Sequence, residues 1–311
     1  MGSMKIIVTG ANGFVGPHLV REVHSRGHEV IGIAHSGEVN PDLIGLLAKF
    51  IECDLTNEEE VAKLPLEDVD AIINLAGLAN VGASFDKPDL YMRVNVDILR
   101  VIGERLIEAG SHARVIAVST GAVYQSDQPL PLTEESVTVT QGSPYSLSKL
   151  AMEEEGKKLK EQGLDLAIVR PFNHAGPGQA SGFLLPDLLK GLMEAKDTGK
   201  PLMVGNLNSR RDYTDVRDVV KAYADLAEIK SLSHTIYNVC SGNSRSGQEV
   251  LDLFLDNTGL RNKVEIKVDQ SRIRPNDPPE LYGSHKRINH ETGWQPTIPF
   301  EKTISDIVNT N

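Results

Sequence analysis

Short runs of β-branched and aliphatic residues recur along the first half of the chain, separated by polar stretches that suit helices. Each run is apolar at successive positions, as in strands that are buried on both faces. Because helix-capable segments separate these runs, the pattern predicts a parallel sheet covered on both sides, which is an α/β fold. The runs that we predict as strands are 4–9, 29–34, 50–53, 71–75, 115–118 and 166–169.

Three helices are expected around this sheet from the spacing of their apolar positions. The first follows a glycine-rich turn and ends at Arg26, and two long ones cover 89–109 and 145–162. A shorter helix is expected over 56–64, because Thr56 and Glu59 have the spacing of an N-terminal capping box.

Beyond Arg170 the alternation of strands and helices loosens. Proline and glycine cluster at 171–182 and again at 274–283, around segments that suit helices. We therefore expect one domain over 1–170 and a smaller, irregular lobe over 171–311, with part of 205–240 returning to the first domain. No internal repeat is evident.

Composition and charge narrow the classes of function. The 311 residues are 40% hydrophobic and 24% charged, which indicates a globular protein. The formal net charge is −11, so a nucleic-acid partner is not expected. The two cysteines, Cys53 and Cys240, allow neither a disulfide framework nor a cysteine zinc site, and no metal is expected. Without a long apolar run or a signal-peptide pattern, we expect no membrane contact and a cytoplasmic location.

Three glycines stand where the first strand meets the first helix. Gly10, Gly13 and Gly16 leave backbone N–H groups free to approach a dinucleotide pyrophosphate at a helix N-terminus. Their spacing of three and three differs from the usual G-x-G-x-x-G pattern. A glycine turn is as often only a structural turn, but its place at this junction favours the binding interpretation.

The segment Thr9-Gly10-Ala11-Asn12-Gly13-Phe14-Val15-Gly16 resembles the T-G-x-x-G-F-x-G signature of the extended short-chain dehydrogenase/reductase superfamily. The resemblance spans nearly the whole chain. It implies a Rossmann-type doubly wound sheet that binds the dinucleotide, and a smaller α/β lobe that binds a nucleotide sugar. The cofactor-binding residues that it implies are Gly10, Asn12, Gly13, Phe14, Val15, Gly16, His35, Ser36, Asp54, Leu55, Leu75, Ala76, Gly77, Asn95, Tyr145 and Lys149.

The choice of nicotinamide cofactor depends on the residues after the second strand. An acidic residue there accepts the ribose 2′-hydroxyl of NAD, whereas its absence accommodates the 2′-phosphate of NADP. His35 and Ser36 occupy this place, and no acid follows until Glu38. NADP is therefore the preferred cofactor, with NAD possible, and His35 can equally be an ordinary surface histidine.

Tyr145 and Lys149 are separated by one helical turn, so their side chains share a face. A tyrosine can give a proton to a carbonyl oxygen during hydride transfer if a neighbouring cation lowers its pKa. Alone, this pair is common on exposed helices. The resemblance adds Thr120 as the residue that holds the substrate oxygen, and it leaves Ser119 as structural.

The two residues after Thr120 limit the reaction. Dehydratases of the superfamily carry an acid and a base there, whereas this chain has Gly121 and Ala122, which exchange no protons. Simple hydride transfer remains, as net reduction of a keto sugar or as the transient oxidation of a 4-epimerase.

Segments of the second half resemble the superfamily members that act on GDP-linked 6-deoxyhexoses. The segments are 170–179, 205–216, 282–287 and 292–296, and the resemblance is strongest to the GDP-4-dehydro-6-deoxy-D-mannose reductases. It implies that Thr120, Asn173, Arg211 and Arg274 contact the sugar or diphosphate. Asp277 stands where a glutamate usually binds the GDP ribose. Rim ion pairs for the arginines and a turn cap for Asn173 remain alternatives.

The expected function is thus NAD(P)H-dependent reduction of the 4-keto group of a GDP-4-dehydro-6-deoxyhexose, giving GDP-D-rhamnose. The first alternative is a UDP-sugar 4-epimerase with tightly bound NAD, and the second is a non-catalytic cofactor-binding scaffold. Pairing of superfamily members through the helices at 89–109 and 145–162 implies a homodimer.

Overall fold

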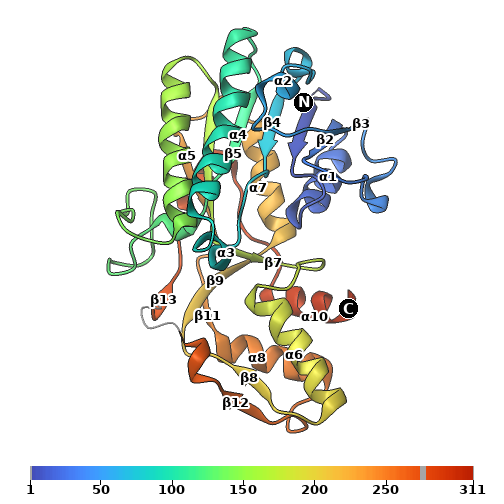
Figure 1. The fold of residues 1–311 in the computed structure, drawn as a ribbon, viewed down its shortest axis with the longest axis vertical. Coiled ribbons are helices and arrows are strands. Elements are labelled where there is room, and N and C mark those ends of the chain that lie inside the picture. The colour runs from blue at the N-terminus through green and yellow to red at the C-terminus, as the bar shows by residue number, and fades with distance from the viewer. Residues whose placement is uncertain (1, 274–277, 311) are drawn as a thin grey trace.

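A computed structural model describes residues 2–273 and 278–310. A seven-stranded sheet forms the upper part in Figure 1, and all of its strand pairs are parallel. The α/β expectation with a parallel, doubly wound sheet is confirmed. In spatial order the strands are β10 (Ile236–Val239), β6 (Leu166–Pro171), β5 (Arg114–Val118), β4 (Ala71–Asn74), β1 (Lys5–Thr9), β2 (Glu29–Ala34) and β3 (Lys49–Glu52).

Helices cover both faces of this sheet, and side chains of one strand point alternately to each. Ile6 and Val8 pack with α1 (Val15–Ser25) and α7 (Val216–Glu228). Ile7 between them packs on the other face with α4 (Pro88–Glu108) and α5 (Pro144–Glu161), which lie side by side in Figure 1. Because both faces of the sheet are covered, successive positions in the interior of a strand must be apolar, as the sequence pattern indicated.

The short helix after β3 begins later than expected. It is α2 (Glu58–Val61), and its N-cap is Asn57, whose side chain accepts hydrogen bonds from the N–H groups of Glu59 and Glu60. The predicted capping box at Thr56 is wrong. The Thr56 hydroxyl instead donates to Asp54 Oδ1 at 2.7 Å, which leaves it unable to cap the helix.

The lower part of Figure 1 is smaller and built from short elements. Its core gathers apolar side chains from α6, α8 and α10. Strand β9 lies centrally there and pairs with β7, β11 and β13, while β8 pairs with β12. The bounds are β7 Asn173–Ala175, α6 Leu184–Thr198, β8 Leu202–Val204, β9 Arg210–Asp215, β11 Ser244–Ser246, α8 Gly247–Thr258, β12 Ile266–Val268, β13 Glu280–Leu281 and α10 Phe300–Thr310. Two further helices belong with the large sheet, namely α3 (Val81–Ser84) and α9 (Lys286–Thr292), and Ile288 of α9 packs in the same core as α1 and α7.

A buried carboxylate on α7 fastens the segment before α10 to the large sheet. Asp218 is fully buried and accepts hydrogen bonds from the N–H groups of Thr297 and Ile298 at 2.8 and 2.7 Å. Its own carbonyl accepts a bond from the indole N–H of Trp294, a residue that is itself buried. One aspartate of α7 thus holds the segment 294–298, which lies far from it in sequence.

Replacing Asp218 with alanine is expected to lower the free energy of unfolding by about 2–4 kcal/mol, because the hydrogen bonds of a fully buried carboxylate to Thr297 and Ile298 are lost. Urea denaturation followed by circular dichroism measures this. Asp42→Ala, which removes an exposed partner of Arg21, is the control and should change stability far less. A loss for Asp218→Ala no larger than that of the control would contradict the assignment.

Among the residues that the structure describes, no helix is both long and apolar enough to cross a membrane.

Candidate active site

The predicted site residues gather where the strand order of the large sheet reverses. Strands β1 and β4 are neighbours, and Thr9 at the end of β1 pairs with Asn74 at the end of β4. The Thr9 hydroxyl donates to Asn74 Oδ1 at 2.6 Å and accepts from the N–H of Ala76 at 3.1 Å. In open parallel sheets, the crevice at such a reversal, beyond the carboxyl ends of the strands, is where ligands bind.

The glycine turn after β1 is shaped by close backbone contacts. Gly10 has a φ of +64°, and its carbonyl accepts the N–H of Gly13 at 2.9 Å. A Cβ at Gly16 would lie only 2.3 Å from the carbonyl oxygen of Ala11. Phe14 is the N-cap residue of α1, which begins at Val15. The turn therefore presents bare backbone at a helix N-terminus, and it fits a dinucleotide pyrophosphate.

The ends of β2 and β3 border the turn. Asn12 donates to the carbonyl of Glu38 at 3.0 Å, which ties the turn to the loop after β2. The side chain of His35 is 77% exposed, and its Nε2 lies 3.9 Å from Asp54 Oδ2. Hydrogen bonds from Thr56 lower the pKa of Asp54, so it stays ionised. Ser36 is exposed and Leu55 is buried.

The loop after β4, with Leu75, Ala76 and Gly77, lies close to α5. Asn95 is 2% exposed and exchanges hydrogen bonds with both backbone groups of Leu78, at 2.8 and 3.1 Å. It also donates to the hydroxyl of Ser148 at 2.9 Å. A Cβ at Gly77 would lie 2.7 Å from Asn95 Oδ1 and 3.6 Å from Lys149 Nζ. Only glycine fits there, with a φ of +152°.

Thr120, Tyr145 and Lys149 come together beside this loop. Thr120 lies two residues beyond the end of β5 and caps the 3-10 turn η3 (Gly121–Val123), where its hydroxyl accepts the N–H of Ala122 at 3.1 Å. The same hydroxyl hydrogen-bonds the phenol of Tyr145. Tyr145 and Lys149 are 8% and 7% exposed, and both lie in the first two turns of α5, which starts at Pro144. The pair is therefore not an exposed helix pair.

The electrostatics of the pair differ from the expectation. Lys149 Nζ donates to the carbonyl of Val118 at 2.8 Å, and burial lowers the pKa of Lys149 to about 8. Burial raises the pKa of Tyr145 above its usual value, and the Thr120 hydrogen bond only partly opposes this. The phenol thus keeps its proton at neutral pH, and the lowered pKa that we expected from Lys149 is not found.

The position after Thr120 is tightly packed. A Cβ at Gly121 would lie 3.0 Å from the ring of Phe172. A Cβ at Gly283 would lie 2.6 Å from the same edge of that ring. An acid at position 121 would therefore require the Phe172 ring to shift.

The smaller lobe adds the predicted substrate residues. Pairing of β7 with β9 aligns Asn173 with Tyr213, two residues from Arg211. Asn173 is exposed, and Arg211 donates to the carbonyl of Pro278 at 2.8 Å. Arg274 and Asp277 lie outside the described residues.

A buried ion pair between α5 and β6, one helical turn beyond Lys149, was not predicted from the sequence. Glu153 and Arg170 are 1% and 3% exposed and form two hydrogen bonds, at 2.9 and 2.5 Å. Ser119, which we expected to be structural, donates to Glu153 at 2.6 Å. The signal that could have revealed Glu153 is its place one further helical turn beyond Tyr145 and Lys149.

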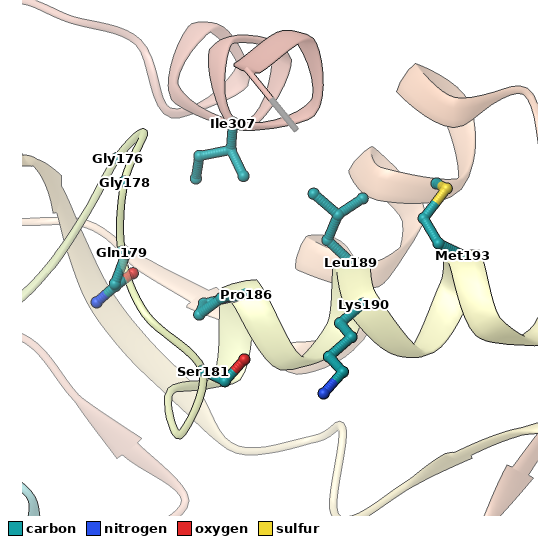
Figure 2. Close-up of a pocket in the computed structure, with 9 residues that line it drawn as sticks. All are labelled: Gly176, Gly178, Gln179, Ser181, Pro186, Leu189, Lys190, Met193 and Ile307. Atoms are coloured by element: carbon teal, nitrogen blue, oxygen red, sulfur yellow. The ribbon is translucent and has the colours of Figure 1, made fainter.

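A separate cavity of about 280 Å³ lies between the loop at 176–181, α6 and α10. Figure 2 shows Leu189 and Ile307 facing each other across it, with Lys190 and Ser181 at another side. Residues predicted for the site are absent from its described lining. It is therefore distinct from the crevice above the sheet.

Comparison with known proteins agrees with this geometry. The GDP-6-deoxy-D-mannose reductase of Pseudomonas aeruginosa is 30% identical, over 98% of this chain and 96% of the reductase. A putative UDP-glucose 4-epimerase of Methanocaldococcus jannaschii is 28% identical, over 98% of this chain and 97% of its own. The structure of RMD from Pseudomonas aeruginosa complexed with NADPH is similar with a TM-score of 0.83 at 28% identity, covering 99% of this chain and 98% of that one.

Residues 6–240 match the sequence model of the NAD dependent epimerase/dehydratase family. This match and the 30% identity across nearly the whole chain confirm the resemblance to the extended short-chain dehydrogenases/reductases. The protein therefore belongs to the NAD dependent epimerase/dehydratase family and is an enzyme of the NAD(P)-dependent oxidoreductase type.

Proposed function

We propose that the protein reduces the 4-keto group of a GDP-4-dehydro-6-deoxyhexose with NADPH and forms GDP-D-rhamnose. The observation that carries the proposal is the buried Tyr145, protonated at neutral pH and hydrogen-bonded to Thr120 above the carboxyl end of β5. The Pseudomonas aeruginosa relative, named as a GDP-6-deoxy-D-mannose reductase, supports the choice of sugar nucleotide.

In this proposal the nicotinamide supplies hydride to sugar C4 when it is bound. Tyr145 gives its proton to O4 as negative charge develops there, and Thr120 holds the same oxygen by a hydrogen bond. Lys149 contributes a positive charge beside the phenol and holds the nicotinamide ribose. A high pKa of Tyr145 suits this direction, because a donor must start protonated, whereas oxidation of an alcohol must start from the phenolate.

The surroundings of Thr120 support hydride transfer without loss of water. A dehydratase needs proton transfer at neighbouring sugar carbons, and Gly121 and Ala122 offer no group for it. Phe172 packs against Gly121, so a side chain at position 121 would require this ring to shift. In the smaller lobe we assign sugar or diphosphate contacts to Asn173 and Arg211, because paired N–H donors of arginine suit a diphosphate.

The assay is direct. Protein, NADPH and GDP-4-dehydro-6-deoxy-D-mannose are mixed, and absorbance at the NADPH band is followed while the product is identified by chromatography. We expect stoichiometric NADPH oxidation and GDP-D-rhamnose. No turnover with either reduced cofactor would discard the proposal, and tightly bound NAD together with interconversion of UDP-glucose and UDP-galactose would favour the 4-epimerase.

NADPH is the proposed cofactor because His35 and Ser36 leave the end of β2 exposed and without an acid. The similar Pseudomonas aeruginosa structure, whose description names NADPH, agrees with this choice. Binding titrations with NADPH and NADH test it, and tighter binding of NADH would reverse it.

Replacing Gly16 with alanine is expected to weaken NADPH binding by about tenfold or more. The new Cβ would lie 2.3 and 2.6 Å from the carbonyl oxygens of Ala11 and Gly10, so the turn would have to move away from the pyrophosphate. Fluorescence titration measures the affinity. Gly82→Ala is the control, because its Cβ meets only a side-chain oxygen at 3.3 Å. Equal affinities of the two variants would contradict the proposed cradle.

We also propose a homodimer that pairs through α4 and α5, which lie together on one face of the sheet. Met92 on α4 is 40% exposed, which provides apolar surface for such a contact. Light scattering that gives the mass of one chain at working concentration would remove this proposal.

A further inference from the structure

Glu153 lies on the same face of α5 as Tyr145 and Lys149, at spacings of four residues. Its side chain is only 1% exposed. Burying a carboxylate costs free energy, because the charged group loses nearly all of its contact with water. The proposed reaction gives it no part. The question is therefore what role a buried carboxylate has on the helix face that carries Tyr145 and Lys149.

The hydrogen bonds of Glu153 fix it from several sides. Oε1 accepts from the hydroxyl of Ser119 at 2.6 Å and from Nε of Arg170 at 2.9 Å, and Oε2 accepts from Arg170 at 2.5 Å. Arg170 donates further to the hydroxyl of Tyr124 at 3.0 Å, which in turn donates to Asn238 at 2.7 Å. The carboxylate is thereby held in one orientation.

This cluster touches the segment that positions the site. Ser119 stands between Val118, whose carbonyl accepts the bond from Lys149, and Thr120, which binds the phenol of Tyr145. Glu153 therefore connects α5 to the end of β5 at the residue between two site contacts. A shift of its carboxylate would move Val118 and Thr120 together.

A small set of titratable groups surrounds Lys149. On α5 they are Tyr145 and Glu153, and the phenol of Tyr145 also interacts with Tyr91 of α4 and Tyr223 of α7. Arg170 of β6 and Tyr124 stand behind Glu153. Burial lowers the pKa of Lys149, and within the described residues Glu153 is the charge that opposes this effect.

We propose that Glu153 is a positioning residue that keeps Lys149 charged in its buried place and holds the Ser119–Thr120 segment against α5. The part of this inference that concerns turnover rests on the proposed function. The part that concerns the charge of Lys149 does not, because it can be measured without substrate or cofactor.

The first experiment titrates Lys149 directly in the ligand-free protein. The protein is labelled with ¹³C-lysine, the Lys149 signal is assigned by its loss in Lys149→Met, and its chemical shift is followed against pH. Glu153→Gln keeps the size and a hydrogen-bond acceptor but removes the charge. We expect the pKa of Lys149 to fall by about one pH unit in this variant. An unchanged titration would overturn the proposal.

Two further variants complete the titration. Glu153→Asp retains the charge on a shorter side chain, so the pKa of Lys149 should stay nearer to the parent value than in Glu153→Gln. Glu228→Gln removes a carboxylate that pairs with Arg26 between α1 and α7, and it should leave Lys149 unaffected. An equal fall of this pKa in Glu153→Asp and Glu153→Gln would show that packing, not charge, is responsible.

The second experiment records turnover against pH. Reduction requires charged Lys149, so activity should decline as pH rises through its pKa. With a pKa about one pH unit lower, Glu153→Gln should match the parent near pH 6 and fall about tenfold below it near pH 9. An equal loss at every pH would contradict the proposal. If the parent shows no turnover, the proposed function fails, but the titration still decides the role of Glu153.

Glu153→Gln leaves Arg170 buried without its partner and can therefore prevent folding. In that case Glu153→Leu with Arg170→Met removes both charges and fills the space with apolar side chains. We expect the same direction of change in the titration of Lys149. An unchanged pKa in this double variant would again overturn the proposal.

Discussion

Tyr145→Phe is expected to lose about 10²- to 10⁴-fold in turnover of the keto sugar, with NADPH affinity retained. The substitution removes one hydroxyl from a residue that is 8% exposed and leaves the ring in place. The Thr120 hydroxyl then loses its partner, and the carbonyl oxygen loses its proton donor. Steady-state kinetics and a binding titration with NADPH separate the two effects.

Tyr237→Phe is the matched control for this variant. Tyr237 is also buried, and its hydroxyl exchanges hydrogen bonds with the backbone of His234, at the opposite end of β10 from Val239. Its loss should affect stability and leave turnover intact. A Tyr145→Phe enzyme that turns over like the parent in every sugar assay would instead revive the non-catalytic scaffold.

Lys149→Met should lower turnover by about 10²-fold or more. The same substitution should stabilise the fold. Burial lowers the pKa of Lys149 from 10.5 to about 8, so keeping it charged costs folding free energy at pH 7. Each unit of this pKa shift corresponds to ~1.4 kcal/mol of folding free energy. After subtracting the lost hydrogen bond to the Val118 carbonyl, we expect Lys149→Met to raise the free energy of unfolding by about 1–3 kcal/mol.

The pH dependence of this gain has a definite sign. Between pH 8 and 10.5 the unfolded lysine binds more protons than the folded one, so the parent becomes more stable as pH rises through this window. The advantage of Lys149→Met should therefore be largest at pH 7 and shrink by pH 10. Urea unfolding at the two pH values measures it, with the exposed Lys157→Met as control. An advantage that is the same at both would contradict the buried charge.

Much of the large sheet could be predicted because its strands carry an unbroken apolar pattern. The strands at 29–34 and 166–169 are found within β2 and β6, since each must be apolar on both faces. The capping of α2 could not be read in this way. Thr56 and Asn57 are both good caps, and only the bond of Thr56 to Asp54 decides between them.

The site residues that share a local motif could be predicted, whereas those joined by tertiary contacts could not. Tyr145 and Lys149 are one turn apart, so their common face follows from helix geometry. Glu153 and Arg170 stand 17 residues apart on a helix and a strand, and nothing local links them. The raised pKa of Tyr145 likewise depends on burial by the surrounding fold.

The fit of Phe172 against two glycines shows the same limit. Gly121 and Gly283, which lie far apart in the sequence, both approach the Cε2 edge of one ring. The sequence shows that position 121 lacks an acid, but only the packing shows that a side chain there would press on the ring of Phe172.

Transfer of the C4 hydride from NADPH to the sugar, with no return, is the central claim. It is tested by a reaction with NADPH that carries deuterium at both C4 positions and GDP-4-dehydro-6-deoxy-D-mannose, followed by mass spectrometry of the nucleotide sugar. We expect one deuterium at C4 in each molecule of product and one oxidised cofactor released for each. A nucleotide sugar formed without deuterium, or with the label retained on a bound cofactor, would contradict it.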